Sequence, residues 1–253
     1  MFRFTENADG SLEVFAGGEH AVITTPEMDV IKINSTNANF FVNYFDLSRN
    51  YDMIIASLGG VSQLKQALAY SHGVRLLAQD LLEVIVGFII SANNNISRIR
   101  RSMKFICEGL GKPVSFGYAF PTLKELSVAD VEFFTKAGLG YRAAYMADTI
   151  KRLSETDMLI RLNALATLEA KRELMTLSGV GPKVADCILV FGLGRREMFP
   201  VDTWIEKMYY KFFSTELRSR TQIASFLAEK FKENSAYAQQ YLYYFTRETK
   251  IKV

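Results

Sequence analysis

Residues 177–202, LSGVGPKVADCILVFGLGRREMFPVD, decide the fold that this chain is expected to adopt. Gly179 and Gly181 flank Val180 and permit a tight turn, because glycine reaches positive φ without steric cost. Pro182 suits the first turn of a helix, where its missing N–H leaves nothing unsatisfied. We therefore predict a helix end, a glycine-rich hairpin and a second helix, whose unpaired backbone N–H groups attract a phosphate.

Two side chains beside this hairpin are suited to chemistry. Lys183 lies in the first turn of the second helix, where the positive end of the helix dipole is expected to lower its pKa and favour the nucleophilic amine. Asp202 lies just before a further helix, where a carboxylate is ordinarily a cap. Taken singly, the two residues are explained as a solvated surface lysine and a helix cap. Their order after the hairpin is more specific than either residue alone.

The pattern Leu-x-Gly-Val-Gly-x-Lys followed by Val-Asp resembles the helix-hairpin-helix and Gly/Pro-Asp signature of the DNA glycosylase superfamily. With lysine at position 183, the chain is similar to the branch that combines glycosylase and AP lyase activities. The resemblance implies that Lys183 is the nucleophile and that Asp202 stays ionised beside the sugar. It also implies that the amides of Gly179, Gly181 and Val184 grip a backbone phosphate, optionally through a structural cation on neighbouring carbonyls.

Length and composition are those of an ordinary globular protein. The chain has 253 residues, 49% of them hydrophobic and 23% charged, which is enough to bury a sizeable core. A net charge of +3 permits a nucleic-acid partner without arguing for one. The longest apolar run, residues 84–90, is too short to cross a bilayer, and the chain opens on no signal pattern. We expect a cytoplasmic monomer with no membrane association, located at the nucleoid if the source is bacterial.

The two cysteines and two histidines limit the metal chemistry that the sequence can support. Cys107 and Cys187 suggest no disulfide framework, and His20 and His72 do not have zinc-ligand spacing. The sequence also does not contain the four closely spaced cysteines that bind an iron–sulfur cluster in endonuclease III-like relatives. We therefore expect no required cofactor, no iron–sulfur cluster and no metal site.

The fold class predicted is mainly α with a small N-terminal antiparallel β subdomain, an α+β architecture. Residues 2–33 alternate apolar and polar positions between turn signals, which predicts a meander. Its inward side is expected to carry Phe2, Phe4, Leu12, Val14, Ala21, Ile23, Ile31 and Ile33. The expected helices include one at residues 81–91 capped by Asp80, one opened by a Thr122–Glu125 capping box, one started by Ser127, and two at residues 203–213 and 221–248.

Three parts are expected in the chain. Residues 1–46 form the antiparallel β subdomain. Residues 47–79 plus 193–253 form a helical subdomain with the catalytic aspartate and the base-pocket helix, and residues 80–192 form a second one that ends in the hairpin. The architecture that the chain resembles places the active site in a cleft between the two helical subdomains.

The polar run SANNNISR follows the apolar segment at residues 81–91 and precedes a basic string. Asparagine is a poor helix former, so a helix-to-helix turn is the ordinary explanation. The run resembles a segment of the 8-oxoguanine DNA glycosylases, in which an asparagine and a following arginine contact the cytosine left unpaired when its partner is flipped out. The resemblance gives these roles to Asn93 and Arg98.

The segment GLGYR interrupts the helical pattern at residues 138–142. A helix C-cap at Gly140 and ordinary surface at Tyr141 would explain it. In the family this tyrosine is a wedge in the duplex and the next arginine helps to hold the orphan cytosine, which implies these roles for Tyr141 and Arg142. An aromatic wedge restores part of the stacking that base flipping removes.

The last expected helix carries Gln239 and Tyr243 four positions apart, hence on one face. Aromatic residues at this spacing ordinarily pack in a core. In the family a glutamine reads the Watson–Crick edge of the damaged base and an aromatic residue four positions later stacks on it, which implies these roles for Gln239 and Tyr243. Cys187, otherwise a buried structural thiol, corresponds to the cysteine that covers the opposite face of the base.

Two positions depart from the family pattern. Family members carry Gly-Gln-x-Phe-Arg-Trp near the start, and this glycine carbonyl separates 8-oxoguanine from guanine; the chain begins inside that motif, at Met1-Phe2-Arg3-Phe4. We expect a truncated start, and the alternative is a different mode of lesion recognition. Trp204 stands where eukaryotic members have a phosphate-contacting histidine, and its indole N–H can still donate to a phosphate.

The sequence thus predicts a bifunctional DNA glycosylase and AP lyase of base excision repair, acting on 8-oxoguanine opposite cytosine in duplex DNA. Lys183 would attack C1′, expel the base and form a Schiff base, after which β-elimination cleaves the strand. Two alternatives stay open: a monofunctional glycosylase for alkylated bases, against which Lys183 argues, and a non-catalytic DNA-binding protein. Opposing-base preference, the relative rates of the two steps and protein partners are not determined by the sequence.

Overall fold

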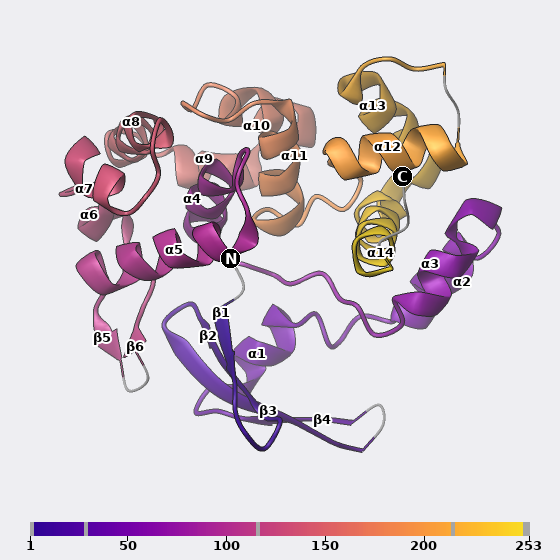
Figure 1. Ribbon diagram of the computed structural model, residues 1–253, viewed down its shortest axis with the longest axis horizontal. Helices are drawn as coiled ribbons and strands as arrows, with labels where there is room; N and C mark the ends of the chain where they lie inside the picture. The colour runs from indigo at the N-terminus through magenta and orange to yellow at the C-terminus, as the bar shows by residue number, and fades with distance from the viewer. Residues whose placement is uncertain (1–2, 28–29, 115–116, 214–215, 250–253) are drawn as a thin grey trace.

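The computed structural model describes residues 3–27, 30–114, 117–213 and 216–249, and it begins with an antiparallel sheet that is followed by helices (Figure 1). The strands pair in chain order, with Val14 opposite Ala21 in the second pairing. Gly17 and Gly18 both have positive φ in the turn between them. The predicted meander is confirmed, and its strands are β1 (Arg3–Glu6), β2 (Leu12–Ala16), β3 (Glu19–Glu27) and β4 (Val30–Asn34).

One face of the sheet is buried under α1 (Ala38–Tyr44) through Val14, Ala16, Ala21 and Ile23. Leu12 and Ile33 are half-buried against this cluster. The prediction that Phe4 and Ile31 face inward is wrong, because both are exposed. Ile31 lies on the edge strand β4, and the ring of Phe4 packs instead beneath the guanidinium of Arg100, 5.3 Å from its centroid. Phe2 lies outside the described residues.

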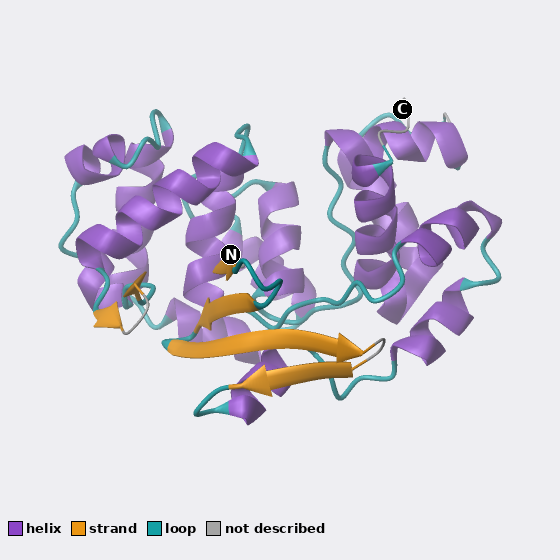
Figure 2. Ribbon diagram, turned by 60° about the horizontal axis from the view of Figure 1, so that its bottom comes forward, coloured by secondary structure: helices purple, strands orange, loops and turns teal. Residues whose placement is uncertain are grey.

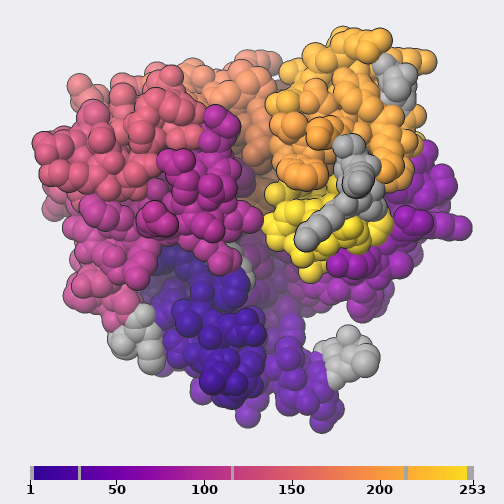
Figure 3. Space-filling model, in the orientation of Figure 1, coloured from indigo at the N-terminus to yellow at the C-terminus, as the bar shows by residue number. Residues whose placement is uncertain are grey.

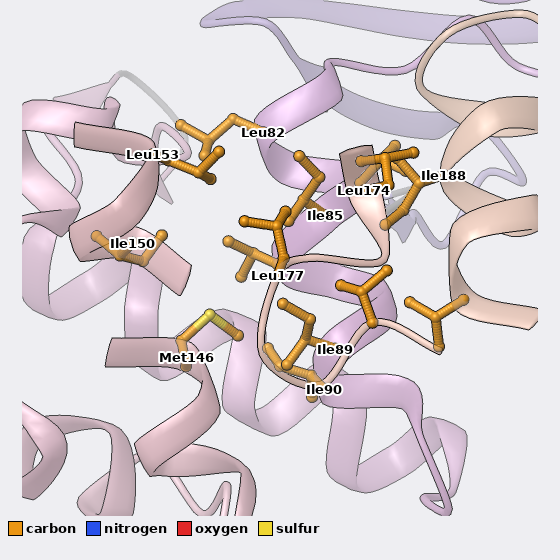
Figure 4. Packing of buried hydrophobic residues seen from close by; sticks show 14 of the residues in the cluster. Leu82, Ile85, Ile89, Ile90, Met146, Ile150, Leu153, Leu174, Leu177 and Ile188 are labelled. Atoms are coloured by element: carbon orange, nitrogen blue, oxygen red, sulfur yellow. The ribbon is translucent and has the colours of Figure 1, made fainter. Parts of the chain in front are cut away.

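A central helix, α4 (Leu81–Ser91), organises the largest core. Its predicted cap is confirmed, since Asp80 accepts the amide of Glu83 at 2.9 Å. Ile85 and Ile89 of α4 pack against residues from three later helices, and Figure 4 shows these contacts. The three helices are α8 (Arg142–Ser154), α10 (Thr167–Leu174) and α11 (Pro182–Phe191). This packing holds the hairpin between α10 and α11 against the buried helix α4.

The helices form two groups behind the sheet in Figure 2, and Figure 3 shows the C-terminal part of the second group, orange to yellow, beside the first. The first group surrounds α4 and also contains α5 (Ile96–Leu110), α6 (Leu123–Leu126), α7 (Val131–Lys136) and α9 (Met158–Ala164). The second group has its own core and contains α2 (Tyr51–Leu58), α3 (Lys65–Tyr70), α12 (Thr203–Phe212), α13 (Arg220–Phe231) and α14 (Ser235–Glu248).

Two details of the helical prediction are wrong, and one strand pair was not predicted. The single helix expected at residues 221–248 is broken by Lys232, whose φ of 49° ends α13 before a short 3₁₀ turn. Ser127 ends α6, and Asp130 caps α7 by accepting the amide of Phe133 at 2.8 Å. A small antiparallel pair, β5 (Pro113–Val114) and β6 (Gly117–Tyr118), was not expected.

The architecture is mainly helical with a small N-terminal antiparallel sheet, as the sequence predicts. The capping box of Thr122 and Glu125 is confirmed. Within the described ranges, no helix is both long and apolar enough to pass through a membrane.

Candidate active site

The hairpin, residues 177–181, has the tight turn that its glycines predict, but only one of them needs to be glycine for its backbone. Gly179 has a φ of +82°, and Val180 donates its amide to the Leu177 carbonyl at 3.1 Å. Gly181 has an ordinary φ of −87°, and a Cβ placed on it would meet open space. The prediction of positive φ is therefore wrong for Gly181, which leaves room in front of the helix.

Backbone donors collect where the hairpin meets α11. Ala185 donates to the Gly181 carbonyl at 2.9 Å, which closes the first turn of the helix. Across the residues that the structure describes, the amides of Gly179, Gly181 and Val184 have no backbone partner. The side chain of Val184 is buried, so only its amide is available. A helix start with free N–H groups is suited to bind an anion.

Lys183 lies half-buried behind these amides. Its ammonium donates to the Cys187 thiol one helical turn later, and Nζ is 5.3 Å from the centroid of the Phe88 ring of α4. Burial lowers the pKa of Lys183, but the adjoining Cys187 sulfur and the Asp202 carboxylate raise it, and the net direction is upward. The predicted lowering is therefore wrong. Cys187 and Asp202 together outweigh burial and the fractional charge of the helix end.

Cys187 is buried on α11 and contacts Lys183. Burial raises the pKa of this thiol to about 11, although the neighbouring ammonium opposes the shift. The thiol therefore stays neutral at neutral pH and presents an apolar, polarisable atom beside the amine.

Asp202 is a helix cap, as predicted, and it also lies close to the Lys183 amine. It is the N-cap of α12, where Oδ1 accepts the Ile205 amide at 2.9 Å. The same carboxylate is one of the charges that raise the pKa of Lys183. The cap therefore holds an anion in a defined place near the amine.

The predicted base-pocket residues come from α14, far along the chain. Gln239 is buried, and its Oε1 accepts a hydrogen bond from Gln240 at 2.6 Å. Tyr243 is half-buried, and it is near enough to Lys183 to affect the pKa of the amine. The fold thus brings Tyr243 of α14 close to Lys183 of α11, and Gln239 lies one helical turn before Tyr243. Gln240, as a contact of Gln239, was missed because a polar residue on a mixed helix has no distinctive pattern.

The three asparagines of residues 93–95 have three different roles. Asn94 donates to the Ile90 carbonyl at 3.0 Å and so completes the end of α4. Asn95 caps α5 by accepting the Arg98 amide at 3.0 Å. Asn93 has a left-handed φ of 47° and an exposed side chain, and the side chain of Arg98 is exposed as well. The two residues expected to contact the orphan base are therefore both available at the surface.

The segment GLGYR separates an exposed tyrosine from a buried arginine. Tyr141 is 59% exposed at the start of α8, as a wedge requires, while Arg142 is only 5% exposed. Arg142 donates from Nε to the Ala92 carbonyl at 2.7 Å and from Nη2 to the Asn93 carbonyl at 2.8 Å. It also donates to the Leu139 carbonyl at 3.1 Å. The structure places Arg142 behind the asparagines, on backbone oxygens, and not beside Arg98 at the surface.

Trp204 lies exposed in the first turn of α12, close to the cap Asp202. The ammonium of Lys207 is 5.7 Å from the centroid of its indole. A cation therefore accompanies the uncharged side chain at this position.

The chain is similar in sequence to known DNA repair proteins. Residues 86–233 match the family described as HhH-GPD superfamily base excision DNA repair protein. The N-glycosylase/DNA lyase OGG1 of Arabidopsis thaliana is 35% identical over 188 residues, which cover 68% of this chain and 52% of that protein. The chain thus spans about half the length of this relative.

Two solved structures superimpose on nearly the whole chain. The Clostridium acetobutylicum 8-oxoguanine glycosylase/lyase, bound to double-stranded DNA with cytosine opposite 8-oxoguanine, is 34% identical with a TM-score of 0.92, covering 99% of this chain and 89% of that one. MBOgg1 in complex with a low-affinity DNA ligand is 35% identical with a TM-score of 0.93 and the same coverage. The chain therefore belongs to the HhH-GPD superfamily of base excision DNA repair proteins.

Proposed function

We propose that the protein is a bifunctional DNA glycosylase and AP lyase that removes 8-oxoguanine, paired with cytosine, from duplex DNA in base excision repair. The observation that carries this proposal is the half-buried Lys183 amine beside Cys187, Asp202 and Tyr243, directly behind free hairpin amides. An amine held next to a phosphate-binding helix start can reach the sugar of a flipped nucleotide. The Clostridium enzyme, whose described activity is that of an 8-oxoguanine glycosylase/lyase, supports the choice of substrate.

The chemistry begins with loss of a proton from Lys183, because only the free amine is a nucleophile. The nitrogen then forms a bond to C1′ while the glycosidic bond breaks, and the base leaves with the bonding electrons and takes up a proton. Opening of the sugar ring gives a Schiff base. Removal of a C2′ proton expels the 3′ phosphate by β-elimination. The Asp202 carboxylate stabilises the positive charge that develops on the sugar.

The other predicted residues divide between the two strands. We assign the flipped base to a pocket formed by Cys187 and Tyr243, which lie near the amine, and by Gln239, one helical turn before Tyr243. We assign the orphan cytosine to the exposed Asn93 and Arg98, and the gap in the stack to the exposed Tyr141. Arg142 supports this group through the Asn93 carbonyl. Gly179, Gly181 and Val184 would hold a phosphate through their amides, and Trp204 with Lys207 a second one.

The proposal extends to the organisation and setting of the enzyme. The division into residues 1–46, 47–79 plus 193–253, and 80–192 is supported by three separate hydrophobic clusters that follow these ranges closely. The two helical clusters meet near residues 189 and 190 of α11. We propose a monomer that works in the cytoplasm on double-stranded DNA, at the nucleoid in a bacterium, with no cofactor and with a structural cation at the hairpin carbonyls.

Borohydride trapping tests the proposal directly, since it reduces a Schiff base to a stable adduct. The wild-type protein should give a covalent complex with duplex carrying 8-oxoguanine opposite cytosine, and Lys183→Gln should give none. Lys136→Gln is the matched control, because Lys136 is an exposed lysine of α7, paired with the exposed Glu132 at 2.7 Å, and has no place in the chemistry.

An adduct formed by Lys183→Gln would move the nucleophile elsewhere. Base release by the wild-type protein without any adduct would indicate a monofunctional glycosylase. Tight binding with no base release would indicate a non-catalytic DNA-binding protein.

A further inference from the structure

Helix α8 contacts two of the segments expected to meet DNA, the asparagine run and the hairpin. At its start, Arg142 holds the carbonyls of Ala92 and Asn93. Two turns later, Thr149 donates to the Ser178 carbonyl at 3.0 Å, which links the helix to the hairpin. A second bond, from the Ser178 hydroxyl to Asp148 at 2.5 Å, strengthens the same junction. The helix that begins at the wedge is therefore hydrogen-bonded directly to the hairpin.

Tyr145 lies on α8 between Arg142 and Thr149. It packs against other residues and is still partly exposed to solvent. It is four residues after Tyr141, so both rings lie on one face of α8, and their centroids are 6.0 Å apart with the planes at 81°. Its other side packs on the hairpin, where a Cβ built on Gly179 would come within 3.2 Å of Tyr145 Cδ2. The side chain is nevertheless 43% exposed.

Within the described chain, the Tyr145 hydroxyl has no hydrogen-bond partner. An exposed aromatic ring between a wedge and a phosphate site has one face against protein and one edge left for the duplex. Ring-to-ring contacts of this edge-on kind stabilise a side chain in one orientation.

We propose that Tyr145 is a positioning residue of the DNA interface: its ring supports the wedge Tyr141 at a set distance from the hairpin, and its free edge packs on the sugar–phosphate backbone. The inference rests on the proposed function, because it assigns the wedge to Tyr141. Its consequence is specific to base flipping. Inserting a wedge offsets the cost of unstacking, so a poorly supported wedge slows extrusion of the base and leaves the later chemistry unchanged.

Three variants separate this role from simple folding. Tyr145→Ala removes the ring, Tyr145→Phe keeps it and removes the hydroxyl, and Tyr70→Ala is the control, an exposed tyrosine of α3 that packs on Tyr244 instead of the hairpin. Each variant is assayed in single turnover on two duplexes, one with 8-oxoguanine opposite cytosine and one with a preformed abasic site. A third measurement follows 2-aminopurine fluorescence beside the lesion on mixing, which reports unstacking without requiring catalysis.

Tyr145→Ala should slow both base release and the fluorescence rise about fivefold to tenfold, the effect expected for one aromatic pair. Strand cleavage at the abasic site should change less than about twofold, because no base has to be unstacked there. Tyr145→Phe and Tyr70→Ala should both resemble the wild-type protein. Equal losses on the two duplexes, or no loss on either, would overturn the proposal. Absence of a borohydride adduct with the wild-type protein would instead refute the proposed function, and the fluorescence comparison would still test Tyr145.

Discussion

Asp202 serves two purposes that do not compete. Its Oδ1 caps α12 through the Ile205 amide, and its charge acts on the Lys183 ammonium. The cap is a local feature that the sequence predicts. The charge has a cost for catalysis, because it favours the protonated lysine in the resting enzyme, and only the neutral amine attacks.

The first prediction concerns the pH dependence of base release. Below the pKa of Lys183 each pH unit raises the fraction of free amine about tenfold, so the rate should climb with pH. Asp202→Asn removes a charge that raises this pKa, so the rising part of the pH–rate profile should move to lower pH. The plateau should fall by about a hundredfold or more, because the charge on the sugar loses its partner.

Single-turnover rates of base release between pH 5 and 10 measure both effects. Tyr44 makes a suitable control site, since its buried hydroxyl lies in the sheet-side cluster; Tyr44→Phe should leave the rising part of the profile in place. A rising part that moves to higher pH in Asp202→Asn would contradict the assignment of the charge.

At this scale the sequence predicted the cap at Asp202 correctly and the direction of the Lys183 pKa shift wrongly. The lysine and the aspartate are where the hairpin pattern places them. The direction of the Lys183 pKa depends on Cys187 and Asp202 together, and the distances between side chains of different helices are not contained in the pattern.

The hairpin is the element on which the site depends, and its two glycines differ in what they tolerate. Gly179→Ala places a Cβ at a φ of +82° and within 3.2 Å of the Tyr145 ring, so it should destabilise the fold by about 1–2 kcal/mol and weaken DNA binding. Gly181→Ala has open space and ordinary φ, so the free energy of unfolding should change by less than about 1 kcal/mol.

Urea unfolding and lesion-duplex titration distinguish the two glycines. Gly181→Ala should still bind DNA less tightly, because the new methyl group stands where a phosphate would approach the free amides. Equal loss of stability in both variants would show that the turn, and not the open space, determines the effect.

Shortening a buried side chain of the central helix α4 should destabilise the fold strongly. Ile89 is buried in the centre of its core and contacts the hairpin side, since its Cγ2 would lie 3.5 Å from a Cβ on Gly179. Ile89→Ala should lower the free energy of unfolding by about 2–5 kcal/mol. Ile160→Ala, on the exposed face of α9, should change it by less than about 0.5 kcal/mol. Urea denaturation measures the difference, and similar values for the two would contradict the assignment of this core.

Helix starts and caps were predictable because they depend on a few neighbouring residues. Asp80, Thr122 and Glu125 behave as their spacing indicates. The break at Lys232 was not predictable, since no glycine or proline marks it and its left-handed φ is held by the packing of α13 and α14.

Across the whole molecule, DNA affinity should depend on a small number of local cations, because the net charge is only +3. Lys207 beside Trp204 is proposed to face a phosphate. Lys207→Ala should therefore reduce the slope of log Kd against log salt concentration by about one. Lys136→Ala is the control, because Glu132 already balances that charge at 2.7 Å. Titrations from low to moderate salt give both slopes, and an unchanged slope for Lys207→Ala would remove the lysine from the interface.

The sequence by itself determined what depends on neighbours along the chain. The hairpin, the N-terminal proline of α11, the cap at Asp202 and the strand alternation of the meander all follow from local conformational preferences. The family signature added roles for residues whose local pattern is ordinary.

Only the tertiary structure decided which of these residues meet. Packing of α14 against the second helical core brings Tyr243 near Lys183, and packing of α8 on α4 turns Arg142 away from the surface onto the Asn93 carbonyl. The tertiary structure also leaves the Phe4 ring exposed beside Arg100 and not buried under the sheet. Such contacts join segments far apart in the chain, so they depend on how the separate cores fit together and not on the order of residues within any one of them.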